Sequence, residues 1–134
     1  MKIALYGMPC TGKSTLMDKI TDAKVINGSR ELRHISGGSF SELSEEEKHQ
    51  VRIKYTEYIN GLKDEVIVSD GHYSFMENVA FTKADGDLYD IFIYLYCSPE
   101  TLKERYALSE KNAKFADESV ESIRQWQEFE IVNL

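Results

Sequence analysis

The chain has 134 residues and an ordinary apolar content, which suit a single globular domain with one small core. Its formal net charge of −7 argues against an extended nucleic-acid-binding surface and against a basic membrane patch. No apolar run approaches the roughly 20 residues that a membrane-spanning helix needs, and the N-terminus has no signal-peptide pattern. Two cysteines without a further Cys or His cluster indicate neither a zinc site nor a disulfide scaffold, so we expect a reducing, cytoplasmic compartment.

The first predicted element is a strand over residues 2–6, and a glycine-rich loop follows it directly. The loop matches the pattern G-x-x-x-x-G-K-[S/T], and a helical pattern over about 13–20 completes the order that this motif requires. Gly7 and Gly12 allow backbone angles and a close approach that a Cβ atom would block. Successive N–H groups and the positive end of the helix would then hold a β-phosphate, which predicts a nucleoside triphosphate site. The residues predicted to bind the nucleotide are Gly7, Pro9, Cys10, Thr11, Gly12, Lys13, Ser14 and Thr15.

The next stretch of chain predicts a strand, two helices and a second strand. Residues 24–26 form a short apolar strand, and the following loop opens into a helix with Ser29 as its N-cap. Ser44 and Glu47 have the spacing of a capping box, and a helical stripe of apolar residues follows them. Residues 66–68 are a continuous apolar run, which is typical of a strand buried on both faces of a parallel sheet.

The last third of the chain predicts a loop, a strand and two helices. Residues 71–88 have no sustained period, and we expect an active-site loop there with a weak helix near 75–81. A strand over 91–96 precedes Ser98-Pro99-Glu100, which supply an N-cap, an N1 proline and a first-turn acid for a helix over about 99–108. After a short polar stretch, a last helix begins near residue 117.

Alternating strands and helices predict an α/β fold with a parallel sheet between two helical layers. In such sheets, ligands lie outside the carboxyl ends of the strands. Gly7, Asn27, Asp70 and Cys97 fall at those predicted ends. We therefore expect the loops that follow these residues to converge on one cleft.

From Gly7 to about Phe129 the chain resembles the P-loop kinases of the adenylate-kinase-like group, which are nucleoside monophosphate kinases and their small-molecule relatives. Residues 66–71 resemble the family's third strand, which ends in an Asp-Gly whose acid holds magnesium through water. Residues 93–105 resemble the strand, Pro-Glu turn and Glu-Arg pair that lead into the family's lid. The resemblance implies a single P-loop kinase domain over residues 1–134, with an acceptor arm at about 28–63, a short lid at about 109–116, and ATP and Mg²⁺ as cofactors.

Three features depart from the family pattern. The place of the family's lid-exit arginine falls on Trp126, which leaves Arg124 as a shifted candidate. The lid is short and offers Lys111 and Lys114 rather than arginines. Four strands are evident, and the fifth strand of the three-layer P-loop NTPase fold is missing or truncated. An unpaired sheet edge exposes free N–H and C=O groups, so we expect that a homo-oligomer could form through this edge.

The predicted catalytic residues are Lys13, Asp70 and Arg105, because phosphoryl transfer depends on positioning and charge neutralisation. Lys13 can reach the β- and γ-phosphates as a mobile point charge, while the Ser14 hydroxyl and Asp70 are the predicted magnesium ligands. Asp70 has a structural alternative as a helix N-cap or turn acid. Arg105 is expected to stack on adenine or to clamp phosphate, with surface pairing to Glu100 or Glu104 as the alternative.

The acceptor is predicted to bind Ser29, Arg30, Arg33 and His72. A guanidinium fork suits a phosphate or carboxylate on a small-molecule acceptor, although both arginines could lie on a solvated helix face. His72 could contact phosphate or acceptor, or serve only in packing. An ionised acceptor needs cationic clamps rather than a strong base, so the arginines favour a nucleotide-type or otherwise anionic acceptor. Asp70 could instead act as the base for an alcohol.

Three functions compete at this stage. The leading one is an ATP-dependent phosphotransferase that moves the γ-phosphoryl group to a small molecule. A GTPase-type switch would need an Asn-Lys-x-Asp guanine signature and an Asp-x-x-Gly switch, and the sequence contains neither. An ATP-binding module or weak ATPase without efficient transfer remains the alternative.

Overall fold

A computed structural model describes residues 1–134, and its centre is a four-stranded parallel sheet in the order β2-β3-β1-β6. The strands are β1 (Lys2–Tyr6), β2 (Lys24–Ile26), β3 (Ile67–Gly71) and β6 (Ile91–Tyr94). The central strand β1 sets the register, with Leu5 opposite Asp70 on β3 and opposite Ile93 on β6. The α/β fold and the four parallel strands predicted from the sequence are confirmed.

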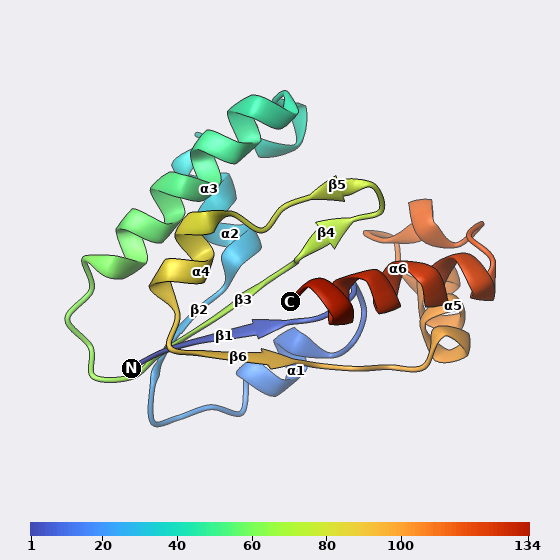
Figure 1. The fold of residues 1–134 in the computed structure, drawn as a ribbon, viewed down its shortest axis with the longest axis horizontal. Coiled ribbons are helices and arrows are strands. Elements are labelled where there is room, and N and C mark those ends of the chain that lie inside the picture. Colours follow the sequence, from blue (N-terminus) through green and yellow to red (C-terminus); the bar gives the residue numbers. More distant parts are fainter.

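The helices are arranged in two groups around the sheet. Figure 1 shows α2, α3 and α4 together on one side, and α5 and α6 beside the carboxyl end of β6. The helices are α1 (Lys13–Met17), α2 (Gly28–Ile35), α3 (Glu45–Asn60), α4 (Lys83–Leu88), α5 (Pro99–Leu108) and α6 (Val120–Asn133), with short 3₁₀ turns at Phe40–Glu42 and Ala113–Phe115. None of these helices has the length and apolar character that would let it cross a membrane.

Each group of helices has its own apolar core. The first core joins the sheet to α2, α3 and α4 and consists of Ala4, Tyr6, Ile26, Tyr55, Ile59, Ile67 and Tyr89. The second joins α5 and α6 to the loop after β1 and consists of Met8, Leu102, Tyr106, Phe115, Ile123 and Trp126. Tyr6 belongs to the first core and Met8 to the second, so the glycine-rich loop begins where the two cores meet.

The helix starts are fixed largely by local caps. Ser44 and Glu47 form the predicted capping box of α3, and Ser98 caps α5 with Pro99 at its first position. The prediction for α2 was wrong by two residues, because Asn27 rather than Ser29 is its N-cap and accepts from the Arg30 amide at 2.9 Å. Asn27 sits at the end of β2, so the strand passes into the helix without an intervening loop.

Residues 71–88 differ most from the prediction. The weak helix expected near 75–81 is wrong: an antiparallel hairpin joins β4 (Ser74–Phe75) to β5 (Asn78–Val79), and Met76 in its turn has a positive φ of 55°. The helix of this region, α4, starts later behind a Thr82–Asp85 capping box. Two helix boundaries also shift, since α1 ends at Met17 rather than near residue 20 and α6 starts at Val120 rather than near 117. The strand predicted over 66–68 is Ile67–Gly71, and the strand predicted over 91–96 ends at Tyr94.

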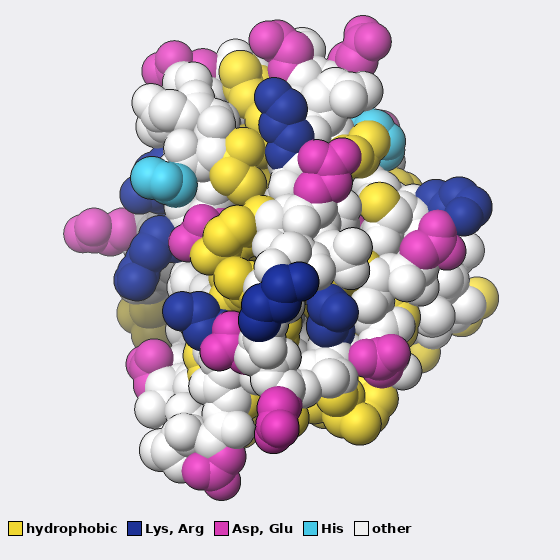
Figure 2. All heavy atoms as spheres, turned by 90° about the vertical axis from the view of Figure 1, so that its left-hand side faces the viewer, with side chains coloured by type: hydrophobic (Ala, Val, Ile, Leu, Met, Phe, Trp, Pro, Cys, Tyr) yellow, Lys and Arg dark blue, Asp and Glu magenta, His cyan; other side chains and the backbone are white.

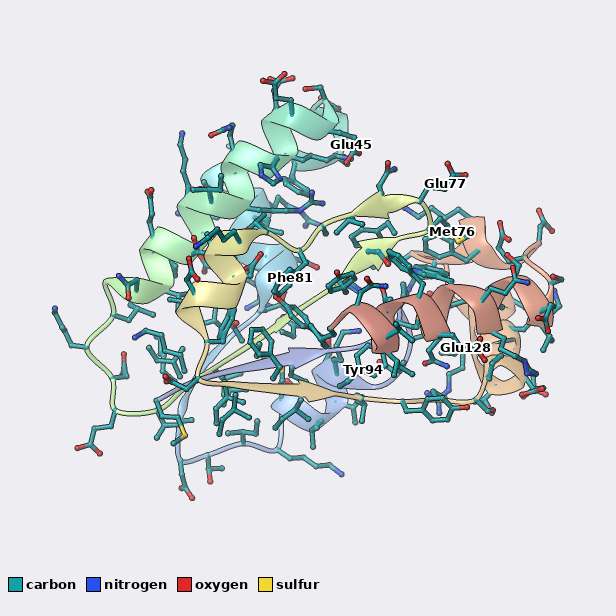
Figure 3. All side chains as sticks on the ribbon, in the orientation of Figure 1. Glu45, Met76, Glu77, Phe81, Tyr94 and Glu128 are labelled. Carbon is teal, nitrogen blue, oxygen red and sulfur yellow. The ribbon has the colours of Figure 1, made fainter.

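The hairpin is held by a buried carboxylate on α6. Glu130 is fully buried, accepts from the Ser74 amide at 3.0 Å and Ser74 Oγ at 2.6 Å, and also accepts from Tyr94 Oη at 2.7 Å. Trp126 Nε1 donates to Ser74 Oγ at 3.0 Å. Figure 3 shows Tyr94 on the strand that runs beside α6. This network attaches the last helix to the sheet and to the segment that leaves β3.

The face at the amino ends of the strands carries charges of both signs. Figure 2 shows Lys and Arg side chains interspersed with Asp and Glu over this face, with apolar side chains between them. The functional residues predicted from the sequence belong instead to the opposite, carboxyl ends of the strands.

Candidate active site

The loop after β1 is the best-defined part of the site. Cys10 and Gly12 have φ angles of 65° and 96°, so the chain takes left-handed conformations twice within three residues. Gly7 is packed so closely that a Cβ atom there would lie 2.7 Å from the Leu95 carbonyl oxygen and 2.9 Å from Thr11 Oγ1. Left-handed residues in a tight loop favour the concave arrangement of main-chain amides that binds phosphate.

Lys13 lies inside this loop and is only 6% exposed. Its Nζ donates to the carbonyl oxygens of Gly7 at 2.7 Å and Met8 at 2.8 Å. Burial lowers the pKa of Lys13 to about 8, and the nearby charge of Asp70 opposes that shift. The ammonium group is therefore held at the loop in a partly desolvated state that an incoming polyphosphate would stabilise.

Asp70 ends β3 and makes a specific contact with the start of α2. The Gly28 amide donates to Asp70 Oδ1 at 2.6 Å, and Gly28 is packed against the Asp70 carbonyl so tightly that a Cβ atom would overlap it. Asp70 is not the N-cap of α2, which is Asn27, but its carboxylate accepts from the first turn of that helix and so has a structural role as well. The second oxygen, Oδ2, has no such bond, and Asp70 lines the cavity beside the loop.

The chemistry of the donors suits magnesium. Ser14 supplies a hydroxyl oxygen and Asp70 a carboxylate oxygen, and both residues line the same cavity. Mg²⁺ commonly takes one or two protein oxygens and completes its shell with water and substrate phosphates. The structure has no group of three His, Cys, Asp or Glu side chains that would form an all-protein metal site. These residues therefore fit a magnesium ion that arrives with a nucleotide.

A cavity of about 650 Å³ opens beside the glycine-rich loop. Most of the predicted site residues line it: Pro9, Cys10, Thr11, Gly12, Lys13, Ser14, Thr15, Ser29, Arg33, Asp70 and His72, together with Lys111 and Lys114 of the lid segment. The lining does not include Gly7, Arg30, Arg105 or Cys97. The expected convergence of loops on one cleft is thus seen for the ends of β2 and β3 and for the glycine-rich loop, whereas Cys97 lies elsewhere.

Arg105 supports the loop rather than lining the cavity. Its Nη1 donates to the Cys10 carbonyl oxygen at 2.8 Å, so neither surface pairing considered from the sequence forms. The Glu100 carboxylate instead forms an ion pair with Arg124, with 3.1 Å between Glu100 Oε1 and Arg124 Nη2. Asn112 Nδ2 donates to Cys10 Sγ at 3.2 Å, which brings the lid segment against the same residue. Cys10 is therefore the point at which α5 and the lid contact the phosphate-binding loop.

His72 lines the cavity two residues after Asp70. Its Nδ1 atom is buried without a hydrogen-bond partner, and its ring centroid lies 4.7 Å from that of Phe75. Burial, followed by the positive charge of Lys13, lowers the pKa of His72 well below its ordinary value. The imidazole is therefore neutral at physiological pH. It can form one hydrogen bond with a ligand, but it contributes no positive charge to the cavity.

Several lining residues were not predicted from the sequence. They come from the segment before α3, from α3 itself and from α4 with its flanks: Phe40, Lys48, Arg52, Tyr55, Asp85 and Tyr89. A signal for part of this set was present, since Lys48, Arg52 and Tyr55 have the i, i+4, i+7 spacing of one helix face. The sequence indicated only an apolar stripe on that helix, and the two basic residues on the Tyr55 face were not predicted to belong to the site.

Comparisons with known proteins place the chain in a family. The AAA domain family matches the chain over residues 3–126. Among solved structures, the chain is similar to shikimate kinase from Aquifex aeolicus, with 16% sequence identity and a TM-score of 0.43, over 86% of this chain and 99% of that one. No curated protein matches the chain. The family match covers most of the chain and includes the phosphate-binding loop, the Asp70 strand end and the lid segment, and the chain therefore belongs to the AAA domain family of P-loop kinase type.

Proposed function

We propose that this protein is an ATP-dependent phosphotransferase that moves the γ-phosphoryl group of ATP to a small-molecule acceptor. The observation that carries the proposal is a single continuous cavity that includes Lys13 and Ser14 of the phosphate-binding loop, Asp70 at the next strand end, and a polar wall on α2 and α3. A nucleotide-binding switch needs only the first of these parts, whereas a transferase needs room for a second substrate beside the triphosphate.

The proposed roles follow from the chemistry of each residue. The loop amides and Lys13 would hold the β- and γ-phosphates. They would thereby stabilise the negative charge that develops on the leaving ADP oxygen as its bond to the γ-phosphorus breaks. Magnesium, when bound through Ser14 and Asp70, supplies neutralisation of the same phosphates. Arg105 holds the Cys10 carbonyl and thereby positions the loop. The acceptor oxygen attacks the γ-phosphorus, and an alcohol acceptor would pass its proton to Asp70 Oδ2, while an already ionised acceptor has no proton to lose.

The acceptor is proposed to be anionic, with Arg33, Ser29 and His72 on the wall that faces it. Arg30 was predicted for the same role, but it does not line the cavity, and we leave it out of the proposed site. Because Cys10 and Cys97 are free thiols, we propose that the reaction takes place in a reducing cytoplasm.

An ATP-binding module with weak hydrolysis is the second candidate. The observation in its favour is the small number of arginines that line the cavity, namely Arg33 and Arg52, while the lid segment contributes only Lys111 and Lys114. Arginine side chains at the γ-phosphate commonly supply a large part of the rate of phosphoryl transfer. A module of this kind would bind ATP without turnover on any acceptor.

Release of ADP separates the two candidates. The wild-type protein and Lys13→Ala would be compared with Mg-ATP alone and with a panel of nucleoside monophosphates, nucleosides, sugars and hydroxy acids. A transferase shows ADP release that one class of acceptor stimulates and that Lys13→Ala loses. Tight ATP binding with equal, slow ADP release across the whole panel supports the module and refutes the transferase.

A further inference from the structure

The strand β6 forms one border of the sheet, and its outer edge is open. It pairs with β1 alone, and just after the strand the Leu95 amide donates to the Tyr6 carbonyl oxygen at 2.7 Å. Figure 1 shows β6 at the border of the sheet, with no further strand beside it. The main-chain N–H and C=O groups on the outer edge of β6 therefore have no partner strand and can pair with another chain.

The sequence of this edge carries none of the residues that commonly protect one. Residues 91–96 read Ile-Phe-Ile-Tyr-Leu-Tyr and contain no charged residue and no proline. Natural sheets protect their open edges with charged side chains, prolines or very short strands. The other border of this sheet follows that rule, because β2 has three residues and begins with the exposed Lys24. The two borders therefore differ, and only the β6 edge is suited to the addition of a strand.

The side chains of β6 divide between a covered face and an open face. Phe92 and Tyr94 pack against the first core. Ile91 and Ile93 alternate with them and point to the opposite face of the sheet, where they are 41% and 47% exposed. Tyr96, just after the strand, is 60% exposed. Apolar side chains thus flank the free main-chain groups, and a strand added to this edge would remove them from water.

We propose that two copies of this chain pair through β6 as antiparallel strands and form one continuous sheet around a twofold axis. An axis perpendicular to the sheet keeps the exposed isoleucines of both copies on the same face. When Phe92 lies opposite the partner's Phe92, Ile91 lies opposite the partner's Ile93, and the reverse pair forms on the other side of the axis. Pairs of β-branched residues that face each other across two antiparallel strands stabilise a sheet. A second copy therefore supplies a strand that matches this edge.

The charges near the edge are compatible with this arrangement. Asp90 directly precedes β6, and its Oδ2 accepts from the Lys2 amide at 2.8 Å. In the pairing centred on Phe92, each Asp90 lies opposite the partner's Tyr94, about 13 Å along the strand from the other Asp90. That separation exceeds the Debye length of about 8 Å at physiological ionic strength, so the two carboxylates repel each other only weakly.

A head-to-tail arrangement is the competing geometry. It would pair β6 of one copy with β2 of the next and would form an open filament rather than a closed dimer. The short strand β2 and its exposed Lys24 disfavour that contact. The twofold arrangement uses the unprotected edge of both copies and leaves β2 free.

Sedimentation velocity of the full chain tests the proposal. Samples up to about 100 μM detect dissociation constants in the micromolar range, and about 0.15 M NaCl screens the net charge of −7 on each copy. We expect wild type to pass from the chain mass of 15.4 kDa to twice that mass as its concentration rises. Ile93→Lys should raise the dimer dissociation constant at least about tenfold, because it places a charge beside the partner's Ile91. Val79→Lys is the matched control: Val79 is 45% exposed on β5, and this variant should dimerise like wild type.

Hydrogen exchange of the wild-type protein locates the contact without a substitution that could disturb folding. Amides of residues 91–95 should exchange more slowly in concentrated than in dilute samples, whereas amides of β2 should not change. A wild-type protein that stays monomeric at the highest concentration refutes the proposal. So does a dimer that leaves exchange at 91–95 unchanged, or one that is equally stable in folded Ile93→Lys. Masses that continue to rise beyond the dimer refute the twofold arrangement and indicate an open assembly.

Discussion

The amide of Gly28 donates a hydrogen bond of 2.6 Å to Asp70 Oδ1, and this contact connects the predicted metal site to the predicted acceptor arm. One carboxylate oxygen of Asp70 binds the first turn of α2, and the residue also lines the cavity beside the phosphate-binding loop. The bond from the Gly28 amide fixes the position of the Asp70 carboxylate relative to α2. Asp70 thus has a structural role at the first turn of α2, and we propose that it also binds magnesium.

Asp70→Asn keeps the size of the side chain and removes its charge. We expect a strong loss of magnesium dependence in ADP release, together with a modest loss of stability of about 1 kcal/mol from the weaker bond to the Gly28 amide. Magnesium titrations of the ADP-release rate and urea unfolding measure the two effects separately. A variant with wild-type magnesium response would remove Asp70 from the metal site.

Gly28→Ala tests the close approach of α2 to β3. The added methyl group would overlap the Asp70 carbonyl oxygen, so we expect destabilisation of about 1–3 kcal/mol. Gly61→Ala is the matched control, because a Cβ atom there meets its nearest neighbours at 3.6 Å in an ordinary backbone conformation, and it should be neutral or stabilising by up to about 1 kcal/mol. Equal urea midpoints for the two variants would contradict the packing described here.

Lys13 makes the stability of the protein depend on pH in a predictable direction. Its folded pKa of about 8 is below the ordinary value of 10.5, so between these two values the unfolded chain binds more protons than the folded chain. The stability of wild type relative to Lys13→Met should therefore rise as the pH rises from 8 to 10.5, by up to about 3 kcal/mol. Urea unfolding of both proteins across this range measures the difference, and a difference that falls or stays constant would contradict the buried position of the ammonium group.

Arg105→Ala removes the bond that α5 donates to the Cys10 carbonyl. Because Arg105 supports the loop from outside the cavity through an exposed bond, we expect the Kd for Mg-ATP to rise by about threefold to tenfold, which corresponds to the usual net value of one ordinary hydrogen bond, about 0.5–1.5 kcal/mol. The acceptor KM should change little. Glu104→Ala, its exposed neighbour on the same helix, serves as the control for calorimetric titrations, and equal affinities in the two variants would refute the supporting role.

Glu130→Leu tests the buried network that attaches α6. The change leaves the Ser74 amide, Ser74 Oγ and Tyr94 Oη without their acceptor, so we expect a loss of at least about 3 kcal/mol. Glu128→Leu on the exposed side of the same helix should cost less than about 1 kcal/mol. Guanidinium unfolding provides the comparison, and similar losses in both variants would contradict the network.

The parts of the fold that depend on local chemistry could be predicted from the sequence. The glycine-rich loop, the Ser44–Glu47 capping box and the Ser98-Pro99 helix start each need particular residues at fixed spacing, and each is confirmed in the structure. The β4–β5 hairpin could not be predicted in this way. Ser74 is held by Glu130, which lies 56 positions away in the chain, so no local sequence pattern indicates this contact.

The residues of the candidate site likewise fall into those that the sequence predicted and those that it did not. Residues that follow strand ends were identified because parallel strands bring their carboxyl ends together, and Asp70 and the phosphate-binding loop do line one cavity. Arg52 and Tyr55 were missed, because a helical stripe shows which side chains share a face and not which part of that face meets a cavity. The role of Arg105 was likewise open, since its carbonyl partner on Cys10 lies 95 positions earlier in the chain.

The central claim is that the loop around Lys13 binds a nucleoside triphosphate. Calorimetric titration with Mg-ATP at neutral pH tests it most directly, with wild type and Lys13→Ala compared at equal concentration and their folded state checked by circular dichroism. We predict saturable binding to wild type and a loss of at least about tenfold in affinity for Lys13→Ala, because the variant removes the only buried ammonium group of the loop. Absence of binding heat with folded wild-type protein at several temperatures, or equal affinity in the two proteins, would contradict the claim.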